Sequence, residues 1–564
     1  MAQIPAAQID LERAVGTMVR MNDFTKSSPL RPRKRPVALL WLFLILLIVT
    51  AIRIRLLDTP LERDEGEFAY GGQLMLQGVS IYTGAYTDAL KLPGTCAAYA
   101  LAMMLFGQTA VGIHAAIIFV TLATAIFVYL LARRACSEAA AVVASGTYAL
   151  LSISPPSFGL AAHATQFVML PAVAGIFLLQ DPGRQSGPAR IFFAGLLLGL
   201  AILMKQTGAV FGVFAALWLA RCEWVSIAPS PRRLAVRLGW LALGGLLPFI
   251  VTCALIAAAG DWPRFWLWTF KFAHAHADIV PLKRGLETAV GVAAQLLMAA
   301  PGLWILSLLG LVLLFRGPVP STWKFFVCAF FLFSLAAVYP GWRGHYFIQL
   351  FPAAGLLGGI AFDALAALLA GLKLSFSPRL VLVPIFFVGM ASPILQWGDV
   401  YFTLGPAAVS RAIYGLSPFP EAVEIGRYLA AHCPARGRIA VLGSEPEIYF
   451  YSHRRAATGY IVTYALMEPQ PYAVQMQKEM ISQIEQANPD YVIFVHVPVS
   501  WLQYSDSKTL ILDWFPKYQK ERLRLVGLVE IPSDGSPDVY RWFNGNPKDV
   551  QTNAQLWIAI FARN

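Results

Sequence analysis

Residues 37–57 read VALLWLFLILLIVTAIRIRLL, and residues 61–70, which follow, read LERDEGEFAY. The first stretch has the roughly 20 apolar residues that a helix needs to cross a bilayer. A basic run at 31–35 precedes it, and positive charge marks the cytoplasmic side of a span. We therefore expect an uncleaved signal anchor, with residues 1–36 as a cytoplasmic tail and the four acids of 61–70 just outside the membrane.

The composition extends this reading to the whole chain of 564 residues. Hydrophobic residues make up 57% and charged residues 13%, against roughly 45–50% and about 25% in soluble domains. Disordered, collagen-like, coiled-coil and disulfide-scaffold proteins are excluded. The net charge of +12 comes from short basic runs between apolar segments, which indicates membrane topology and no nucleic-acid partner. We expect a polytopic α-helical membrane protein.

The basic runs also predict the topology. Residues 92–107 are apolar, and if they crossed the membrane, the basic clusters at Arg133, Arg221 and Arg233 would fall outside. If 92–107 forms a short interfacial or re-entrant helix, all of these clusters fall inside, which the charge rule favours. Eleven spans are then expected, with the N-terminus inside and the C-terminus outside: 37–57, 109–132, 138–154, 164–180, 191–204, 207–220, 238–259, 292–315, 325–339, 346–371 and 380–397.

This map divides the chain into a transmembrane domain, 37–397, and an external domain, 398–564. External loops are expected at 58–108 and 260–291. The last domain alternates helical and β-rich stretches, which predicts a small soluble α/β domain. Its expected helices are 420–432, 445–452, 471–487 and 508–518, and its expected strands are 438–443, 491–497 and 523–531.

Candidate chemistry lies on the outer side of this map. Asp64 and Glu65 could simply cap a helix, but a carboxylate at a water–lipid boundary can also act as a general base. Lys91 could be a snorkelling lysine or could bind a phosphate at headgroup depth. Arg343 and His345, in a tight turn, could be interface anchors or a phosphate site. His163, in another external turn, is a weaker candidate.

Several chemistries are disfavoured by what the sequence lacks. It has no Walker motif, no G-x-G-x-x-G opening a helix, no H-E-x-x-H and no G-x-S-x-G. An ATP-driven pump is therefore not expected. Ionisable residues within the spans are few, with Asp363 the main exception, which weakens the case for a secondary transporter. No cofactor is predicted with certainty: a divalent metal is possible, but no residue spacing supports a site for one.

The order of these features resembles the GT-C superfamily of integral-membrane glycosyltransferases. The features are a first helix, external Arg63-Asp64-Glu65, Lys91-Leu92-Pro93 opening an interfacial helix, and then many spans. The chain is most similar to the bacterial branch related to protein O-mannosyltransferases and the lipid A aminoarabinose transferase. Leu198 to Leu203 followed by Lys205 and Gly208, and His345-Tyr346 ahead of Pro352, also resemble that branch.

The resemblance implies which residues act. Asp64 matches the catalytic aspartate of the first loop, Glu65 matches the second member of the Asp-Glu pair, and Lys91 matches the lysine that contacts the donor phosphate. Related transferases often carry an acid directly before that lysine, where this chain has Leu90, so a metal at that position is in doubt. The residues predicted to bind the donor phosphate are Lys91, Arg343, His345, Tyr346, Arg63 and Lys205.

The resemblance also implies an activity and a location. We expect a sugar to move from a polyprenyl-phosphate carrier to an envelope lipid, glycan or protein, by direct displacement with inversion. The expected location is the bacterial inner membrane, with the active site and residues 398–564 on the periplasmic side. Two other classes stay open, a lipid-linked-sugar flippase or transporter and a non-catalytic membrane scaffold.

Overall fold

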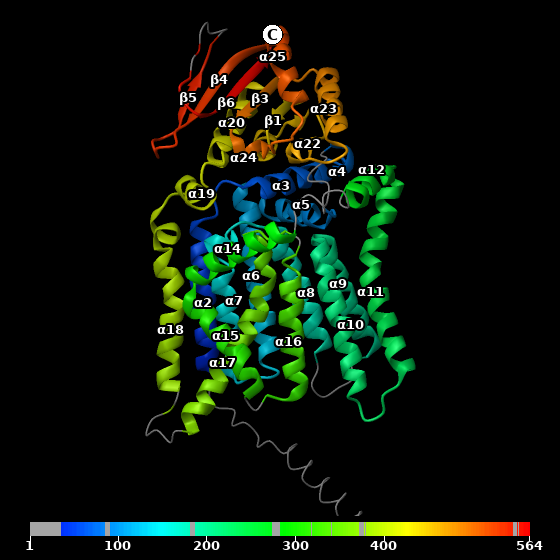
Figure 1. Cartoon of the computed structure of the whole chain (residues 1–564), viewed down its shortest axis with the longest axis vertical. Coiled ribbons are helices and arrows are strands. Elements are labelled where there is room, and N and C mark those ends of the chain that lie inside the picture. Colours follow the sequence, from blue (N-terminus) through cyan, green and yellow to red (C-terminus); the bar gives the residue numbers. More distant parts are fainter. Residues whose placement is uncertain are drawn as a thin grey trace, which may run out of the picture.

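The chain forms a helical bundle that carries a layer of short helices and then a sheet domain at one end (Figure 1). The computed structural model describes residues 35–564 except 85–90, 181–186, 273–281, 317–318, 340, 372–376, 378, 545–549 and 551. The predicted cytoplasmic tail therefore lies almost entirely outside the described residues, as does part of the predicted loop 260–291.

Helices of mostly apolar composition make up the bundle. Four described helices are long and apolar enough to cross a membrane, or five if one bent pair counts as a single span, so the protein is multi-pass. Helix length does not establish the predicted count of eleven. The helices of the bundle are α2 (Arg35–Arg55), α6 (Ala110–Ala132), α7 (Glu138–Leu151), α8 (Ala164–Leu179), α9 (Pro188–Met204), α10 (Ala209–Trp224), α11 (Pro231–Ala258), α15 (Pro301–Arg316), α16 (Ser321–Ala336), α17 (Phe351–Gly371) and α18 (Arg379–Gln396).

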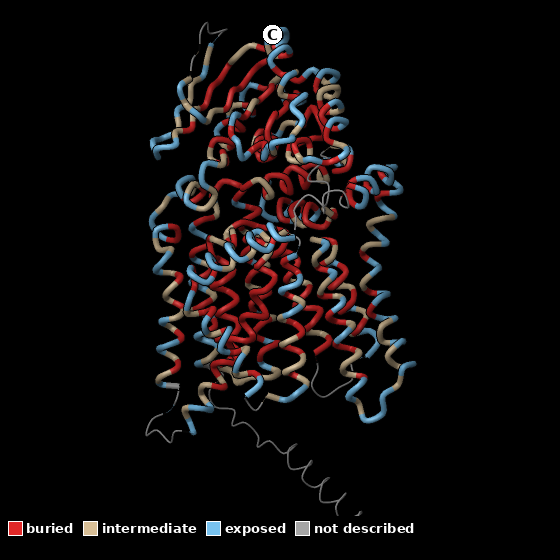
Figure 2. The backbone as a smooth tube through the Cα atoms, viewed as in Figure 1, coloured by how far each residue is buried: buried red, intermediate tan, exposed pale blue. Residues whose placement is uncertain are grey.

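The outer surface of the bundle is apolar. Figure 2 shows buried residues concentrated between the helices and exposed residues along the outer ones. Phe43 and Leu47 of α2, and Leu380, Val388 and Leu395 of α18, are large apolar side chains with at least 49% exposure. A soluble protein rarely exposes so much contiguous apolar surface, so these faces suit contact with lipid.

The structure contradicts one predicted span. Residues 292–315 were expected to form a single transmembrane helix, but they belong to α14 (Leu282–Ala299) and α15, whose axes differ by 110°. Pro301 begins α15, and a proline disfavours helical geometry in the residue before it and offers no N–H to the preceding turn. The apolar run is therefore continuous in sequence and broken in space.

Short helices lie across the upper ends of the bundle, with α3 and α5 running nearly perpendicular to it (Figure 1). They are α3 (Arg63–Leu76), α4 (Ile81–Gly84), α5 (Gly94–Phe106), α12 (Trp262–Trp266) and the π-helix η3 (Leu267–Phe272). The 13 residues of α5 span about 20 Å, less than a bilayer core of about 30 Å. Gly72 allows α3 to approach α5 closely, because a Cβ there would meet the Ala100 nitrogen at 3.0 Å.

The C-terminal domain is a six-stranded sheet in the order β2-β1-β3-β6-β4-β5. Strands β1, β2 and β3 are parallel, and β6 joins antiparallel to both β3 and β4. The strands are β1 (Arg438–Leu442), β2 (Arg455–Ala456), β3 (Tyr491–His496), β4 (Leu523–Ile531), β5 (Val539–Trp542) and β6 (Leu556–Arg563). The helices are α19 (Pro406–Tyr414), α20 (Phe419–His432), α21 (Glu447–Ser452), α22 (Tyr464–Met467), α23 (Ala473–Ala487), α24 (Pro498–Trp501) and α25 (Leu510–Arg522).

Candidate functional site

Helix α3 presents Asp64 in its first turn, and a capping box fixes that turn. The Glu62 carboxylate accepts a hydrogen bond from the Glu65 backbone N–H at 3.0 Å, and the Glu65 carboxylate accepts one from the Glu62 N–H at 3.1 Å. This reciprocal pair satisfies two N–H groups that the start of a helix leaves unpaired. The direction of Asp64 is therefore set by local backbone geometry.

Glu65 has a second task, because it connects α3 to two other segments. Its Oε1 accepts a hydrogen bond from the Ala162 N–H at 2.6 Å and lies 3.0 Å from His114 Nε2. His114 Nδ1 lies 2.8 Å from the Leu57 carbonyl oxygen. Since both partners of this imidazole are acceptors, it donates from both nitrogens when Glu65 is ionised. Glu65 is 1% exposed and positions the chain just before His163.

Lys91 lies beside Asp64 at the start of α5. Its Nζ is 3.3 Å from Asp64 Oδ1 and 2.9 Å from Glu67 Oε2, and it lies 4.6 Å from the centre of the Phe68 ring. The two carboxylates come from the same face of α3, one turn apart. The lysine is thereby held over the first turn of the helix.

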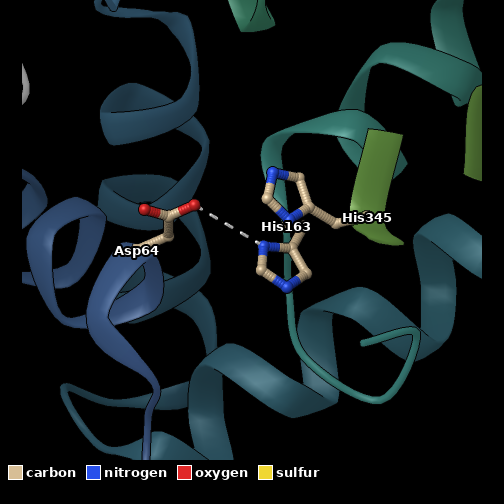
Figure 3. Close-up of side chains that lie close together, drawn as sticks. All are labelled: Asp64, His163 and His345. Atoms are coloured by element: carbon tan, nitrogen blue, oxygen red, sulfur yellow. Dashed lines mark ion pairs between the residues drawn. The ribbon is translucent and has the colours of Figure 1, made fainter. Parts of the chain in front are cut away.

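His163 and His345 complete the opposite side (Figure 3). Their rings stack with centres 4.4 Å apart, and His163 Nδ1 lies 3.9 Å from Asp64 Oδ2. The Thr165 hydroxyl donates to the His345 carbonyl at 2.8 Å. Gly344 permits this approach, because a Cβ there would collide with the carbonyl oxygen of Pro156.

These groups surround a cavity of about 80 Å³. Lys205 also faces it, with its Nζ 3.7 Å from the centre of the Tyr346 ring. One carboxylate, two ammonium groups and two imidazoles thus converge from four regions that are distant in sequence: 64–91, 163, 205 and 345. The residues that line the cavity are Asp64, Phe68, Lys91, His163, Ala164, Met204, Lys205, Gln206, His345 and Tyr346.

The charges decide the protonation states in this cavity. Burial opposes ionisation of Asp64, but the positive charge of Lys91 and its neighbours outweighs burial and holds the pKa of Asp64 well below its usual range. Burial lowers the pKa of His163 to about 4. Burial, aided by the charge of Asp64, raises the pKa of Glu62 well above its usual range. At neutral pH Asp64 is therefore an anion and His163 a neutral imidazole.

Three of these residues can serve as ligands for a metal ion. One potential ligand atom each from Asp64, His163 and His345 lies within 4.8 Å of the others. Both nitrogens of His163, and Nδ1 of His345, are buried without a hydrogen-bond partner among the described residues. Two neutral imidazoles and a carboxylate suit a divalent transition metal, so the residues present fit such an ion. The sequence spacing had not indicated this site.

Two predicted phosphate-binding residues do not line the cavity. Arg63 points toward the C-terminal domain, where its Nε donates to the Ser444 carbonyl at 2.5 Å and its Nη2 lies 3.4 Å from Glu445 Oε1. Arg343 is exposed beside the turn that carries His345. A basic residue next to Asp64 in sequence faces away from it in space, because neighbours on a helix diverge by about 100°.

The Arg63 contacts are part of an interface that holds α3 against the C-terminal domain. The Arg63 guanidinium lies between the rings of Phe419 and Tyr464, 5.4 and 5.2 Å from their centres. Gly66 packs on the backbone of Glu447, where a Cβ would meet the Glu447 nitrogen at 2.6 Å.

Two hydrogen bonds extend this interface from just before α3 to the middle of the helix. The Tyr451 hydroxyl accepts from the Leu61 N–H at 2.8 Å, and the Tyr70 hydroxyl accepts from the Ala456 N–H at 2.9 Å. We call this set of contacts, from Leu61 to Tyr70, the α3 clamp. It makes the C-terminal domain a support for the helix that carries Asp64.

Sequence reasoning missed the central placement of His163, Glu67 and Gln206. His163 was named from the sequence only as a weaker candidate in an external turn. Glu67 was visible as one of the four acids of 61–70, and its place one turn after Asp64 was the signal that both could face one cation.

Comparisons with known proteins agree with this architecture. A model of the family described as dolichyl-phosphate-mannose-protein mannosyltransferase matches residues 92–256, which begin directly after Lys91. No curated protein sequence matches the chain.

Solved structures share the fold at low sequence identity. ArnT from Cupriavidus metallidurans in the apo state is 16% identical, with 93% of this chain and 98% of that chain covered and a TM-score of 0.55. The same protein bound to undecaprenyl phosphate covers 81% of this chain and 92% of its own, at 16% identity and a TM-score of 0.51.

The archaeal oligosaccharyltransferase AglB from Archaeoglobus fulgidus, in complex with an inhibitory peptide and a dolichol-phosphate, is 14% identical. The match covers 93% of this chain and 76% of that chain, with a TM-score of 0.51. The resemblance to integral-membrane glycosyltransferases expected from the sequence is thus confirmed, in the fold of the whole chain and in the family model over 92–256.

Proposed function

We propose that this protein is an inverting glycosyltransferase that takes a sugar from a polyprenyl-phosphate carrier at the outer face of a bacterial inner membrane. Its acceptor is an envelope lipid, glycan or protein. The observation that carries the proposal is the single cavity in which Asp64 faces Lys91 and Lys205. That arrangement offers a proton acceptor and a cationic site within one small volume.

The proposed step is a direct displacement at the anomeric carbon of the donor sugar. The acceptor hydroxyl oxygen forms a bond to that carbon from the face opposite the phosphate. The bond between the carbon and the phosphate oxygen breaks, and its electron pair leaves with the phosphate. Asp64 accepts the acceptor proton. Its low pKa does not prevent this, because the hydroxyl becomes strongly acidic once its oxygen bonds to the sugar carbon.

Positive charge from Lys91, beside Asp64, and from Lys205, which also lines the cavity, stabilises the leaving phosphate. Each charge-assisted hydrogen bond from a lysine to the developing charge contributes about 1.5–3 kcal/mol. Asp64, His163 and His345 would hold a divalent metal, which supplies further positive charge beside the phosphate when bound.

A comparison of cell envelopes tests the proposal. Mass spectrometry is applied to cells that lack the protein, cells that carry the wild type, and cells that carry Asp64→Asn at equal abundance. We expect one sugar mass to be present on an envelope component only with the wild type. Identical envelopes in all three strains would refute the proposal, and a sugar retained with Asp64→Asn would remove Asp64 from the chemistry.

A further inference from the structure

A larger cavity lies at the other end of α3. It has a volume of about 540 Å³ and lies where α3 and α4 meet the edge of the sheet and the end of α23. Tyr70 lines it from α3, six residues after Asp64, which corresponds to about 9 Å along the helix.

Two arginines lie side by side at this cavity. Arg438 begins β1 and Arg455 begins β2, and the two residues are register partners on neighbouring parallel strands. Such partners lie about 4.8 Å apart, and like charges in that position repel. None of the described residues that line the cavity is acidic. The cavity therefore has a concentrated positive charge that an anionic ligand would neutralise.

The remaining polar groups suit a sugar ring. The Gln483 Oε1 accepts hydrogen bonds from the Thr458 hydroxyl at 2.7 Å and the Gly459 N–H at 2.9 Å, which holds the loop after β2 in place. The Gln483 Nε2 donates to Glu479 Oε1 at 3.0 Å, so the Gln483 side chain supports the wall and does not contact the sugar. The Thr83 hydroxyl donates to the Ser80 carbonyl at 3.1 Å and the Gln486 Nε2 to the Ser482 hydroxyl at 2.8 Å, so what Thr83 and Gln486 offer a sugar hydroxyl is an acceptor oxygen each. The Arg455 Nε donates to the Gln77 side-chain oxygen at 3.2 Å, so one edge of this guanidinium is fixed by α3's C-cap.

We propose that this cavity binds a phosphorylated saccharide, with Arg438 and Arg455 on the phosphate and the acceptor oxygens of the wall on the sugar. The planar guanidinium binds phosphate oxygens in pairs, and two guanidinium groups match a doubly charged phosphate monoester. The volume lies within the usual range for small-molecule sites. Resting on the proposed function, we assign this saccharide to the acceptor, since the cavity and Asp64 share one helix.

Calorimetric titration of the purified full chain with glucose 1-phosphate tests the site. The titration is carried out in the Lys91→Ala background, so that binding at the smaller cavity does not contribute. Arg438→Gln and Arg455→Gln should each raise the Kd by about ten- to a hundredfold, the effect of one lost charge-assisted contact. Arg427→Gln is the matched control, an exposed arginine elsewhere in the same domain, and should leave the Kd unchanged. An unchanged Kd in both cavity variants overturns the proposal.

Two further titrations separate the sources of affinity. Glucose should bind much more weakly than glucose 1-phosphate, and inorganic phosphate should bind more weakly as well. Inorganic phosphate binding as tightly as the sugar phosphate would overturn the saccharide part of the proposal. Asp64→Asn should retain the binding even though it strongly lowers transfer, so a failure of this site and a failure of the proposed function give different results.

Discussion

Asp64 shows how one residue can have two faces with different roles. Its Oδ1 is directed toward Lys91, and its Oδ2 toward His163. The capping box sets the backbone from which both directions follow. Burial opposes ionisation of this carboxylate, but the positive charge of Lys91 beside it prevails, so its pKa is well below the usual range and it is an anion at neutral pH.

Asp64→Asn should lower sugar transfer by about 10²–10⁴, the usual contribution of a positioned base. The amide keeps the volume of the side chain and removes its charge and its ability to accept a proton. Turnover is measured on detergent-purified protein with a polyprenyl-phosphate-linked sugar. Glu67→Gln, one turn away on the same helix, is the control and should cost less. Wild-type turnover in Asp64→Asn would contradict the assignment.

The cations of the site are expected to differ in their effects. Lys91→Ala and Lys205→Ala should each reduce transfer by about ten- to a hundredfold, because both ammonium groups face the cavity. Arg343→Ala should have a smaller effect, because Arg343 is exposed and does not line the cavity. Transfer is measured for each variant, and the binding of a short-chain polyprenyl phosphate is measured beside it. Equal losses in all three variants would place Arg343 on the phosphate, as the sequence predicted.

For single residues, the sequence predicts site residues whose position follows from their neighbours in the chain. It misses those that only the packing of distant segments brings into the site. Asp64 and Lys91 could be identified because their neighbours in the chain define their place relative to the first helix and α5. His163 could not, because its importance comes from stacking on His345, which follows it by several helices. No rule of spacing along one chain finds ligands that only packing brings together.

At the scale of elements, α3 is the most constrained helix of the site. It packs on α5 below and on α21 above, and small residues permit both approaches: Gly72 toward Ala100 and Gly66 toward Glu447. Neither contact can shift without moving Asp64.

Gly66→Ala should therefore disturb the site although residue 66 does not line the cavity. A Cβ at this position meets backbone atoms of Glu447, which cannot rotate away, so overpacking should cost about 1–3 kcal/mol. Thermal unfolding and turnover are measured together, and both should fall. Gly212→Ala on α10 is the control, since a Cβ there meets nothing within 4 Å. Equal behaviour of the two variants would show that the α3 clamp is not tight.

Substitution of Arg63 tests the ion pair that the α3 clamp contains. Arg63→Ala leaves the buried Glu445 with the Ser500 hydroxyl but without its cationic partner, and breaking a buried ion pair typically costs about 3–5 kcal/mol. We expect a lower unfolding temperature and a lower turnover, with the affinity for polyprenyl phosphate unchanged. Arg63→Lys should restore only part of the stability, because an ammonium cannot reproduce the contacts of the guanidinium. A large loss of phosphate affinity would instead support the role that the sequence predicted for Arg63.

Helices and strands were predicted well where the sequence has a strong periodic pattern. They were predicted poorly where packing against another element determines the structure. Strands β1, β3 and β4 and their neighbouring helices follow from alternation with helical stretches. Strand β6 was missed, because the sequence pattern predicts no helix ahead of LWIAIFAR at 556–563; in the sheet, β6 pairs antiparallel with both β3 and β4. The break between α14 and α15 was missed because hydropathy counts apolar residues and does not register a proline at the boundary.

At the scale of the whole molecule, the layer of short helices lies between the bundle and the sheet domain (Figure 1), and Asp64 of α3, in that layer, lines the cavity. The topology predicted from charge puts that level at the outer face of the membrane. This can be tested by single cysteines in a chain whose six native cysteines are replaced.

Ser536→Cys should react with a membrane-impermeant maleimide in intact cells, because Ser536 is exposed in the C-terminal domain. Ile227→Cys, fully exposed in the connection between α10 and α11 at the opposite end of the bundle, should react only after the cells are opened. The reverse pattern would mean that 92–107 crosses the membrane and that the domain lies in the cytoplasm.

The α3 clamp also has a consequence in time. Leu61 and Tyr451 are 390 residues apart in the chain, and at synthesis rates of about 5–20 residues per second the ribosome needs about 20–80 s to cover that distance. During that interval α3 has been synthesised, but the residues of the C-terminal domain that contact Arg63, Gly66 and Tyr70 have not. A nascent or prematurely terminated chain therefore holds the acid and the lysines without their final geometry. We expect the reaction to begin only once the last domain has folded, which keeps unfinished chains from consuming lipid-linked sugar.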